Sequence, residues 1–165
     1  MGEESPLNDK FVLVVDDEPD VLDTVEETLT MCVVHKASDF DTALSLLQKN
    51  TYDLVILDIM GVRGFELLKH SAARGFLTVM LTAHAATTES LRKSIKLGAA
   101  SFLPKEYMGE LREVLEDILR GKGQRFWWRK SFDRTNVFFA RALGSDWKEK
   151  DAFFKEFAET LKHKE

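Results

Sequence analysis

Short runs of consecutive apolar residues alternate with amphipathic segments over the first 120 positions of the chain. The clearest runs cover residues 11–15, 54–57 and 77–81, and weaker ones cover about 32–36 and 101–103. Runs of this length that are largely apolar, without strict alternation, are typical of strands buried on both faces of a parallel sheet. The pattern therefore predicts five strands, each followed by a helix.

The segments between the runs repeat their apolar residues at helical spacing. Helices are predicted on these sets: Leu22, Val25 and Leu29; Phe40, Ala43, Leu44 and Leu47; Phe65 and Leu68; Leu91 and Ile95; Leu111, Val114, Leu115, Ile118 and Leu119. Pro19 suits the first turn of the first helix, Ser38 with Asp41 resembles a capping box, and Gly98 ends the fourth helix. This alternation predicts an α/β fold, a doubly wound five-stranded parallel sheet covered on both faces.

The last 45 residues differ in composition from the rest. Residues 121–165 contain 11 Lys and Arg against seven Asp and Glu, and they hold all three Trp and ten of the 17 aromatic residues. We predict a flexible N-terminus over 1–9, a main domain over 10–120, and an aromatic-rich helical C-terminal extension over 121–165. One helix is predicted over about 127–142 and another from Ser145-Asp146 onward.

Charge and composition limit the function classes. A net charge of −5 and a pI near 5.5 argue against general affinity for nucleic acid. No apolar stretch reaches membrane-spanning length, and the polar N-terminus is unlike a signal peptide, so a cytoplasmic protein without a membrane span is expected. The extension is too short for a full winged helix, and no DNA-binding domain is evident in it.

Polar residues follow four of the predicted strands. Asp16-Asp17-Glu18 come after the first strand, Asp58 after the third, Thr82 after the fourth and Lys105 after the fifth. The carboxyl ends of parallel strands share one edge, where such sheets bind ligands. Carboxylates gathered there would repel one another unless a cation neutralised them, and a set of oxygen ligands suits Mg²⁺. Each residue alone could be a helix cap or a solvated charge.

Four segments together resemble the receiver domain of two-component response regulators. They are Val-Leu-Val-Val-Asp16-Asp17-Glu18-Pro19, Asp-Leu-Val-Ile-Leu-Asp58-Ile-Met, Val-Met-Leu-Thr82-Ala83 and Gly98-Ala-Ala-Ser-Phe102-Leu-Pro-Lys105. The resemblance spans about residues 9–120. It implies a flavodoxin-like sheet of order 2-1-3-4-5 and a signalling switch rather than an enzyme.

The resemblance also implies a role for each matching residue. Asp58 would accept a phosphoryl group from a histidine kinase or a phosphotransfer protein. Mg²⁺ would be held by Asp16, Asp17, Asp58 and the backbone carbonyl of Met60. Thr82, the Ala83 amide and Lys105 would bind the phosphoryl oxygens, and Thr82 and Phe102 would be the switch residues. A homodimer could form through the face of the fourth helix, fifth strand and fifth helix, or through the extension.

Two departures from the family pattern concern loops at the site. Glu106 follows Lys105 where the family usually has a proline, and Pro104 precedes it. Only 24 positions separate Asp58 from Thr82, and Met60-Gly61-Val62-Arg63-Gly64 replaces the usual loop. These differences leave the phosphoryl lifetime and the choice of partner open.

Other functions fit part of the pattern. A degenerate receiver would act by protein–protein contact without efficient phosphorylation. A haloacid-dehalogenase-type phosphatase also uses a strand-end Asp and Mg²⁺, but it needs a second Asp at position 60, which is Met. A flavodoxin-like FMN carrier shares the topology, although Asp16-Asp17-Glu18 would repel its phosphate. In the extension, the basic and aromatic residues 125–130 could bind a membrane surface or single-stranded nucleic acid, or simply pack against the domain.

Overall fold

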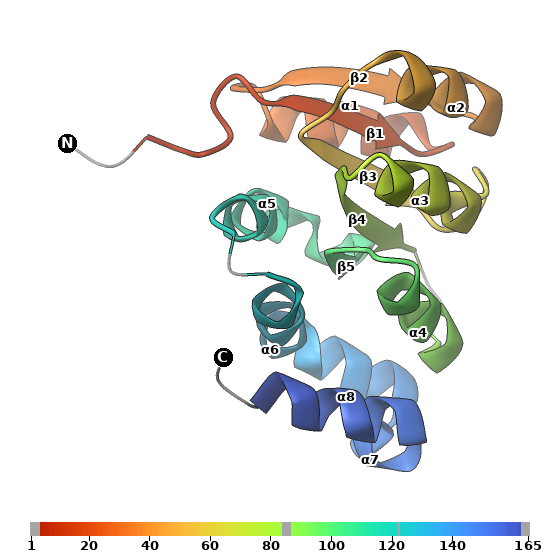
Figure 1. Ribbon diagram of the computed structural model, residues 1–165, viewed down its shortest axis with the longest axis vertical. Helices are drawn as coiled ribbons and strands as arrows, with labels where there is room; N and C mark the ends of the chain where they lie inside the picture. The colour runs from red at the N-terminus through yellow and green to blue at the C-terminus, as the bar shows by residue number, and fades with distance from the viewer. Residues whose placement is uncertain (1–3, 84–86, 122, 163–165) are drawn as a thin grey trace.

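A single parallel sheet organises the protein. The computed structural model describes residues 4–83, 87–121 and 123–162. Five strands lie in the order β2-β1-β3-β4-β5, as the resemblance implied (Figure 1). They are β1 (Phe11–Val15), β2 (Val33–Ala37), β3 (Leu54–Asp58), β4 (Leu77–Thr82) and β5 (Ser101–Pro104). Every neighbouring pair is parallel, which confirms the predicted sheet.

Helices cover both faces of this sheet. One face packs against α1 (Pro19–Thr28) and α5 (Leu111–Leu119), and the other against α2 (Phe40–Lys49), α3 (Gly64–Ala73) and α4 (Thr88–Lys96). The central strand β3 is buried at every position, as its unbroken apolar sequence predicts. A short 3₁₀ helix, η1 (Lys105–Glu110), joins β5 to α5.

Helix boundaries follow most of the local signals. Pro19 occupies the first turn of α1, and Gly98 follows α4 with a positive φ of 98°, which favours glycine. The predicted cap of α2 was wrong by one residue. The N-cap is Asp39, whose side chain accepts from the Thr42 amide, because a carboxylate is as good a cap as the Ser38 hydroxyl and lies at the position where the helix begins.

The segment before β1 packs against the domain. Leu7 is fully buried among residues of α1, α5 and the sheet, and the Ser5 hydroxyl donates to Glu116 at 2.6 Å. The Asp9 amide donates to the carbonyl of Met31. Residues 4–9 of the predicted flexible N-terminus therefore contact the domain through Ser5, Leu7 and Asp9.

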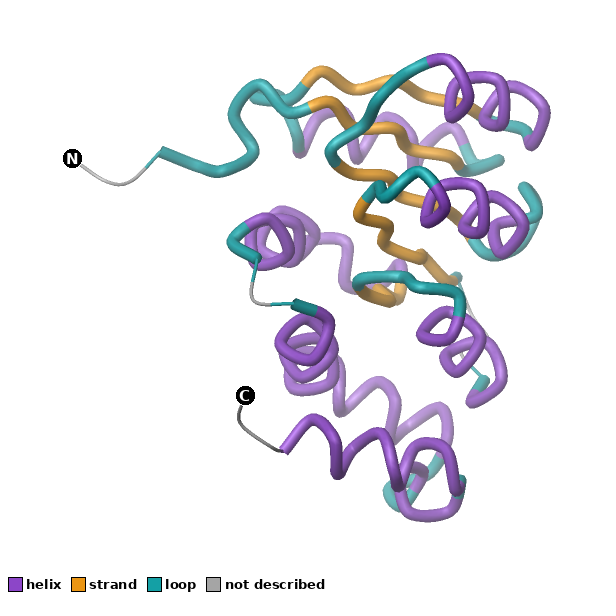
Figure 2. The backbone as a smooth tube through the Cα atoms, viewed as in Figure 1, coloured by secondary structure: helices purple, strands orange, loops and turns teal. Residues whose placement is uncertain are grey.

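The C-terminal extension is helical, as predicted, and lies beyond β5 (Figures 1 and 2). It forms α6 (Gln124–Leu143), α7 (Trp147–Lys150) and α8 (Ala152–Lys162). The second predicted helix is divided in two at Asp151, which has extended backbone angles. No helix in the described residues is long and apolar enough to span a bilayer.

Aromatic side chains of the extension join the main core. Trp128, Phe132 and Phe139 of α6 are buried in the cluster that also holds Met80 and Phe102 of the sheet. The indole of Trp127, half-buried, packs against the cluster on the opposite face. Aromatic residues of the 125–130 segment thus pack against the domain. This supports the packing interpretation of that segment over binding of a membrane surface or single-stranded nucleic acid.

Helix α6 lies along the edge strand β5. The Trp128 indole donates to the carbonyl of Ala99 at 3.1 Å, and the Ser131 hydroxyl donates to the carbonyl of Phe102 at 3.3 Å. Arg134 of α6 forms an ion pair with Asp117 of α5 at 2.9 Å. The extension therefore covers part of the α4–β5–α5 face, so a homodimer through that part of the face would require α6 to move.

Candidate phosphoacceptor site

A pocket of about 580 Å³ opens at the carboxyl edge of the sheet. Its lining residues are Asp17, Glu18, Asp58, Ile59, Met60, Gly61, Phe65, Thr82, Ala83, Thr87, Ser90 and Lys105. Almost all the residues singled out from the sequence are among them. Asp16 is fully buried beneath the pocket, and Phe102 lies away from it in the core.

The sheet register brings these residues together. Asp58 is the last residue of β3 and pairs with Leu81, while Thr82, the last of β4, pairs with Pro104. The Asp16 amide continues the β1 ladder by donating to the carbonyl of Ala37. Strand ends in register leave the side chains that follow them at one edge, as the sequence argument required.

Lys105 links the carboxylates. Its ammonium lies 2.8 Å from Asp16 Oδ2, 3.1 Å from Glu18 Oε1 and 3.3 Å from Asp58 Oδ1. Burial alone would lower the pKa of Lys105, but its hydrogen bonds to Asp16 and Glu18 and the charge of Asp58 raise it above the usual value. The lysine is therefore a fixed positive charge at the site.

One ammonium does not neutralise the carboxylates around it. Burial, reinforced by the negative charge of Asp16, raises the pKa of Asp58 to about 6. Burial also raises the pKa of Asp16, although its contacts with Lys105 and the Glu18 amide oppose this. An excess of buried negative charge at one edge favours binding of a further cation.

The donor set fits Mg²⁺. Carboxylate oxygens of Asp16, Asp17 and Glu18 lie within 4.8 Å of one another, and Asp58 is close enough to Asp16 and Asp17 for their charges to raise its pKa. All are hard oxygen donors, and the open pocket leaves room for water ligands, which Mg²⁺ retains. Glu18, one of the acidic residues that follow the first strand, is not among the Mg²⁺ ligands that the resemblance implied, and its contact with Lys105 is visible only in three dimensions.

The short loop after Asp58 packs tightly against the site. Gly61 has a φ of 80°, and a Cβ atom there would lie 2.5 Å from Oδ2 of Asp17. A Cβ at Gly64 would overlap the carbonyl oxygen of Asp58. A side chain at either position would therefore displace Asp17 or the backbone after Asp58. The two glycines were visible in the sequence, but their closeness to Asp17 and Asp58 could not be predicted from it.

The remaining predicted residues differ in exposure. Thr82 is buried at the pocket wall, and Met60 is 75% exposed at its rim. Phe102 is fully buried, with its ring 5.7 Å from that of Phe139. Peptide bonds throughout the described residues are trans, so η1 runs from Lys105 on through Glu106 without the cis bond of the family pattern.

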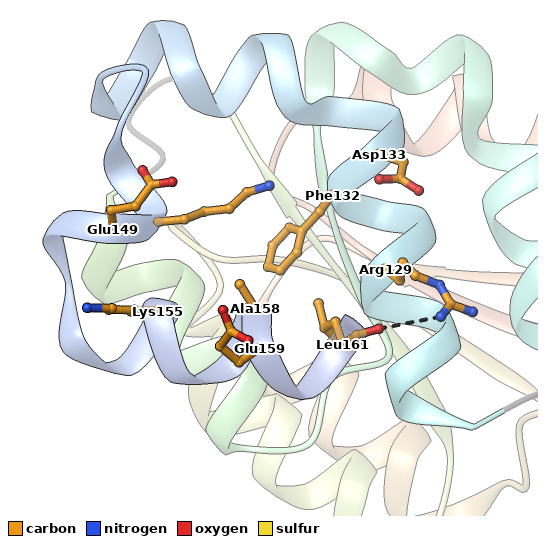
Figure 3. A pocket seen from close by; sticks show the side chains of 9 residues that line it. Arg129, Phe132, Asp133, Glu149, Lys155, Ala158, Glu159 and Leu161 are labelled. Carbon is orange, nitrogen blue, oxygen red and sulfur yellow. Dashed lines mark hydrogen bonds between the residues drawn. The ribbon is translucent and has the colours of Figure 1, made fainter. Parts of the chain in front are cut away.

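A second pocket, of about 500 Å³, lies within the extension between α6 and α8 (Figure 3). Three cationic residues, Arg129, Lys148 and Lys155, line it together with Asp133, Glu149 and Glu159 around an apolar floor of Phe132, Ala158 and Leu161. The Arg129 guanidinium donates to the carbonyl of Leu161 at 3.4 Å. The sequence carries no signal for this pocket, because the pocket depends on how α6, α7 and α8 pack.

Comparison with known proteins identifies a family. Residues 12–116 match the family model described as the response regulator receiver domain. The chain is 34% identical over 118 residues to the two-component response regulator ARR2 of Arabidopsis thaliana, and 33% identical over 138 residues to ORR22 of rice, Oryza sativa. These matches cover 67% and 79% of the chain but only about one fifth of each relative.

Solved structures show the same fold. The receiver domain of NtrX from Brucella abortus is 32% identical with a TM-score of 0.60, and the match covers 67% of this chain and 99% of that one. A CheY-like receiver domain protein from Methanospirillum hungatei has a TM-score of 0.58 at 23% identity, covering 70% of this chain and all of the other. The matches favour a receiver over the phosphatase and the FMN carrier.

Proposed function

The chain belongs to the receiver-domain family of two-component response regulators, and we propose that within it the chain is a phosphorylation switch whose acceptor is Asp58. The observation that carries this proposal is the convergence of Asp16, Asp58 and Lys105 within hydrogen-bonding reach at one edge of the sheet. Thr82 completes the set as a buried hydroxyl at the pocket wall.

In the proposed reaction an oxygen of Asp58 forms a bond to phosphorus. The phosphorus–nitrogen bond of a donor phosphohistidine breaks, and its electron pair remains on the imidazole nitrogen. Lys105 and the Thr82 hydroxyl bind the equatorial oxygens, with the Ala83 amide as a third donor. When bound to Asp16, Asp17, Asp58 and the Met60 carbonyl, Mg²⁺ would neutralise charge on the transferred group.

By the same proposal, the phosphoryl donor is a histidine kinase or a phosphotransfer protein, and the transfer takes place in the cytoplasm. The chain then has no enzymatic output beyond its own phosphorylation and dephosphorylation. Met60 and Phe65 give the pocket an apolar rim next to the acceptor, which suits docking of a partner helix.

The test is phosphorylation by a small donor. Acetyl phosphate or phosphoramidate with Mg²⁺ should add the mass of one phosphoryl group to the intact protein. Asp58→Asn should abolish the adduct, whereas Asp53→Asn, at an exposed carboxylate on the opposite end of β3, should not. Absence of an Asp58-dependent adduct would contradict the proposal.

A second candidate is a receiver that acts by contact alone. The tight loop after Asp58, where a Cβ at Gly61 would collide with Asp17, favours it because that loop borders the proposed metal site. Titration with beryllofluoride and Mg²⁺ separates the two candidates. Saturable binding that depends on Asp58 supports the phosphorylation switch, and its absence supports the contact-only receiver.

A further inference from the structure

We infer that the C-terminal extension is an intramolecular clamp, which opposes closure of the pocket around a phosphoryl group on Asp58. This inference rests on the proposed function and adds a regulator to it, carried by the same chain. Two sets of contacts support it, one to the strand that delivers Lys105 and one to the helix that borders the pocket.

The first set holds β5. Phe102 of this strand is covered by Phe139 of α6, and the Phe102 carbonyl accepts a hydrogen bond from Ser131. Pro104, two residues on, pairs with Thr82, and Lys105 follows it directly. A displacement at the end of β5 that carried Lys105 toward a new ligand would therefore strain the contacts of this strand with α6.

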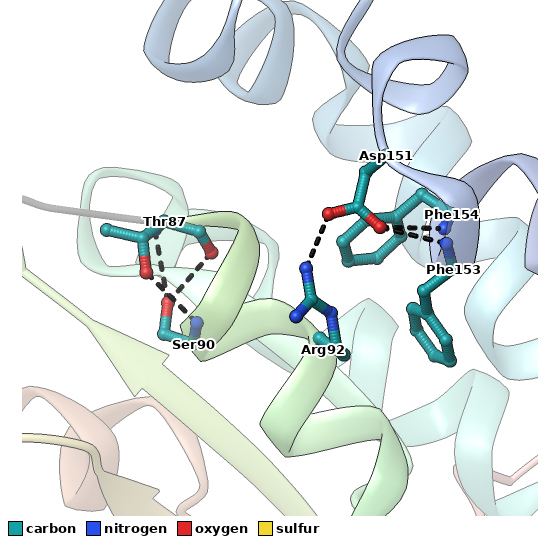
Figure 4. A network of polar contacts seen from close by, with 6 residues as sticks. All are labelled: Thr87, Ser90, Arg92, Asp151, Phe153 and Phe154. Atoms are coloured by element: carbon teal, nitrogen blue, oxygen red, sulfur yellow. Dashed lines mark hydrogen bonds and ion pairs between the residues drawn. The ribbon is translucent and has the colours of Figure 1, made fainter.

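The second set holds α4 (Figure 4). Thr87 and Ser90, which form the capping box of this helix, line the phosphoacceptor pocket. Two residues after Ser90, Arg92 forms an ion pair with Asp151. Asp151 also begins α8, because its Oδ1 accepts from the amides of Phe153 at 2.9 Å and Phe154 at 3.4 Å. The start of α8 is thus tied to a helix whose first turn borders the site.

The present contacts of Lys105 decide whether the extension opposes or favours phosphoryl binding. Lys105 is bonded to Asp16 and Glu18 as well as lying near Asp58. Binding a phosphoryl group would require Lys105 to turn to the new oxygens and the neighbouring chain to follow. The contacts of the extension with β5 and α4 fit the present position of Lys105, so they lower the affinity for the phosphoryl group. By linkage, binding of the phosphoryl group weakens these contacts by the same factor.

Tryptophan fluorescence gives a direct readout, because Trp127, Trp128 and Trp147 all lie in the extension. Beryllofluoride with Mg²⁺, which stands in for the aspartyl phosphoryl group, should change the emission of the full chain. Trp128 and Trp147 are buried, so loosening of the clamp should shift their emission toward longer wavelength. Asp58→Asn should remove the response.

Affinity measures the clamp itself. Asp151→Asn removes the charge that pairs with Arg92 but keeps a good N-cap for α8, and it should tighten beryllofluoride binding about fivefold. Arg92→Gln should act in the same direction, and the double variant should add little to either single one. Asp146→Asn is the matched control, because its ion pair with Lys150 lies within the extension, and it should leave the affinity unchanged.

The outcomes separate this inference from the proposed function. Calorimetry that detects no beryllofluoride binding to the wild-type chain contradicts both. Binding that leaves the tryptophan emission unchanged, or affinities for Asp151→Asn and Arg92→Gln equal to or weaker than the wild-type value, overturns the clamp and leaves the acceptor role intact.

Discussion

The ammonium of Lys105 lies 2.8 Å from Oδ2 of Asp16, a carboxylate that has no exposed surface. The same lysine is proposed to bind phosphoryl oxygens, and the same aspartate to bind Mg²⁺. Without a bound metal ion, Lys105 offsets part of the negative charge of Asp16. Binding of Mg²⁺ to Asp16 and release of Lys105 from Asp16 are therefore coupled in the proposed reaction.

Lys105→Met should destabilise the metal-free protein. The substitution leaves Asp16 and Asp58 buried without their cationic partner, which should lower the free energy of unfolding by about 3 kcal/mol. Mg²⁺ should restore more stability to this variant than to the wild type. Urea unfolding in EDTA and in Mg²⁺ measures both effects. Lys150→Met, at an exposed ion pair, is the control, and an equal loss there would contradict the explanation.

Asp58→Asn should stabilise the metal-free protein at neutral pH. The pKa of Asp58 is raised from 3.8 to about 6 by burial and by Asp16. Because this pKa is raised in the folded state, the contribution of Asp58 to the free energy of unfolding is greatest below pH 3.8. That contribution is lost as the pH rises through about 6. Removing the charge should therefore gain about 3 kcal/mol at pH 7.5.

The pH dependence is the test of this assignment. The advantage of Asp58→Asn in urea unfolding should shrink as the pH falls from 7.5 to 5. It should also shrink when Mg²⁺ is added at pH 7.5, because the cation stabilises the ionised carboxylate of the wild type. An advantage that is the same at both pH values would show that Asp58 titrates normally.

Gly61→Ala should weaken Mg²⁺ binding through Asp17. The new methyl group would lie 2.5 Å from the Asp17 carboxylate and must displace it, so we expect a loss of affinity of about tenfold, similar to other changes that misplace a metal ligand. Calorimetric titration with Mg²⁺ measures the loss. Gly75→Ala is a matched control, because Gly75 has a similar φ of 76° but no atom within 4 Å of the added Cβ.

Phe139→Ala should destabilise the whole domain. The ring is fully buried against Phe102, Phe132 and Trp147, and its removal should cost about 3 kcal/mol. Val137→Ala, on the same helix but 63% exposed, should cost little. Chemical unfolding followed by circular dichroism compares the two. Equal effects would mean that α6 does not share the main core.

The sheet, and the gathering of polar strand-end residues at one edge of it, were predictable because strong local signals agreed. Strands buried on both faces, such as β3, have unbroken apolar sequences, and their order in a parallel sheet places Asp58, Thr82 and Lys105 at one edge regardless of loop details. Gly98 and Pro19 marked helix ends by their backbone preferences.

The less predictable features depend on contacts between distant segments. Nothing in the sequence near Leu7 indicated that it would reach the core between α1 and α5. Asp39 and Ser38 are both good caps, and only the path of the chain decides between them. The break at Asp151 arises where a carboxylate pairs with Arg92, 59 positions earlier. Periodicity over residues 145–161 could not indicate that partner.

The covalent connection between α5 and α6 has a further consequence for any competing partner. Only four residues separate Leu119 from Gln124, so α6 stays near β5 even when it is detached. A tether this short keeps the local concentration of α6 on the order of millimolar. A protein that binds the same part of the face from solution must outcompete that concentration, and weak or non-specific partners are excluded.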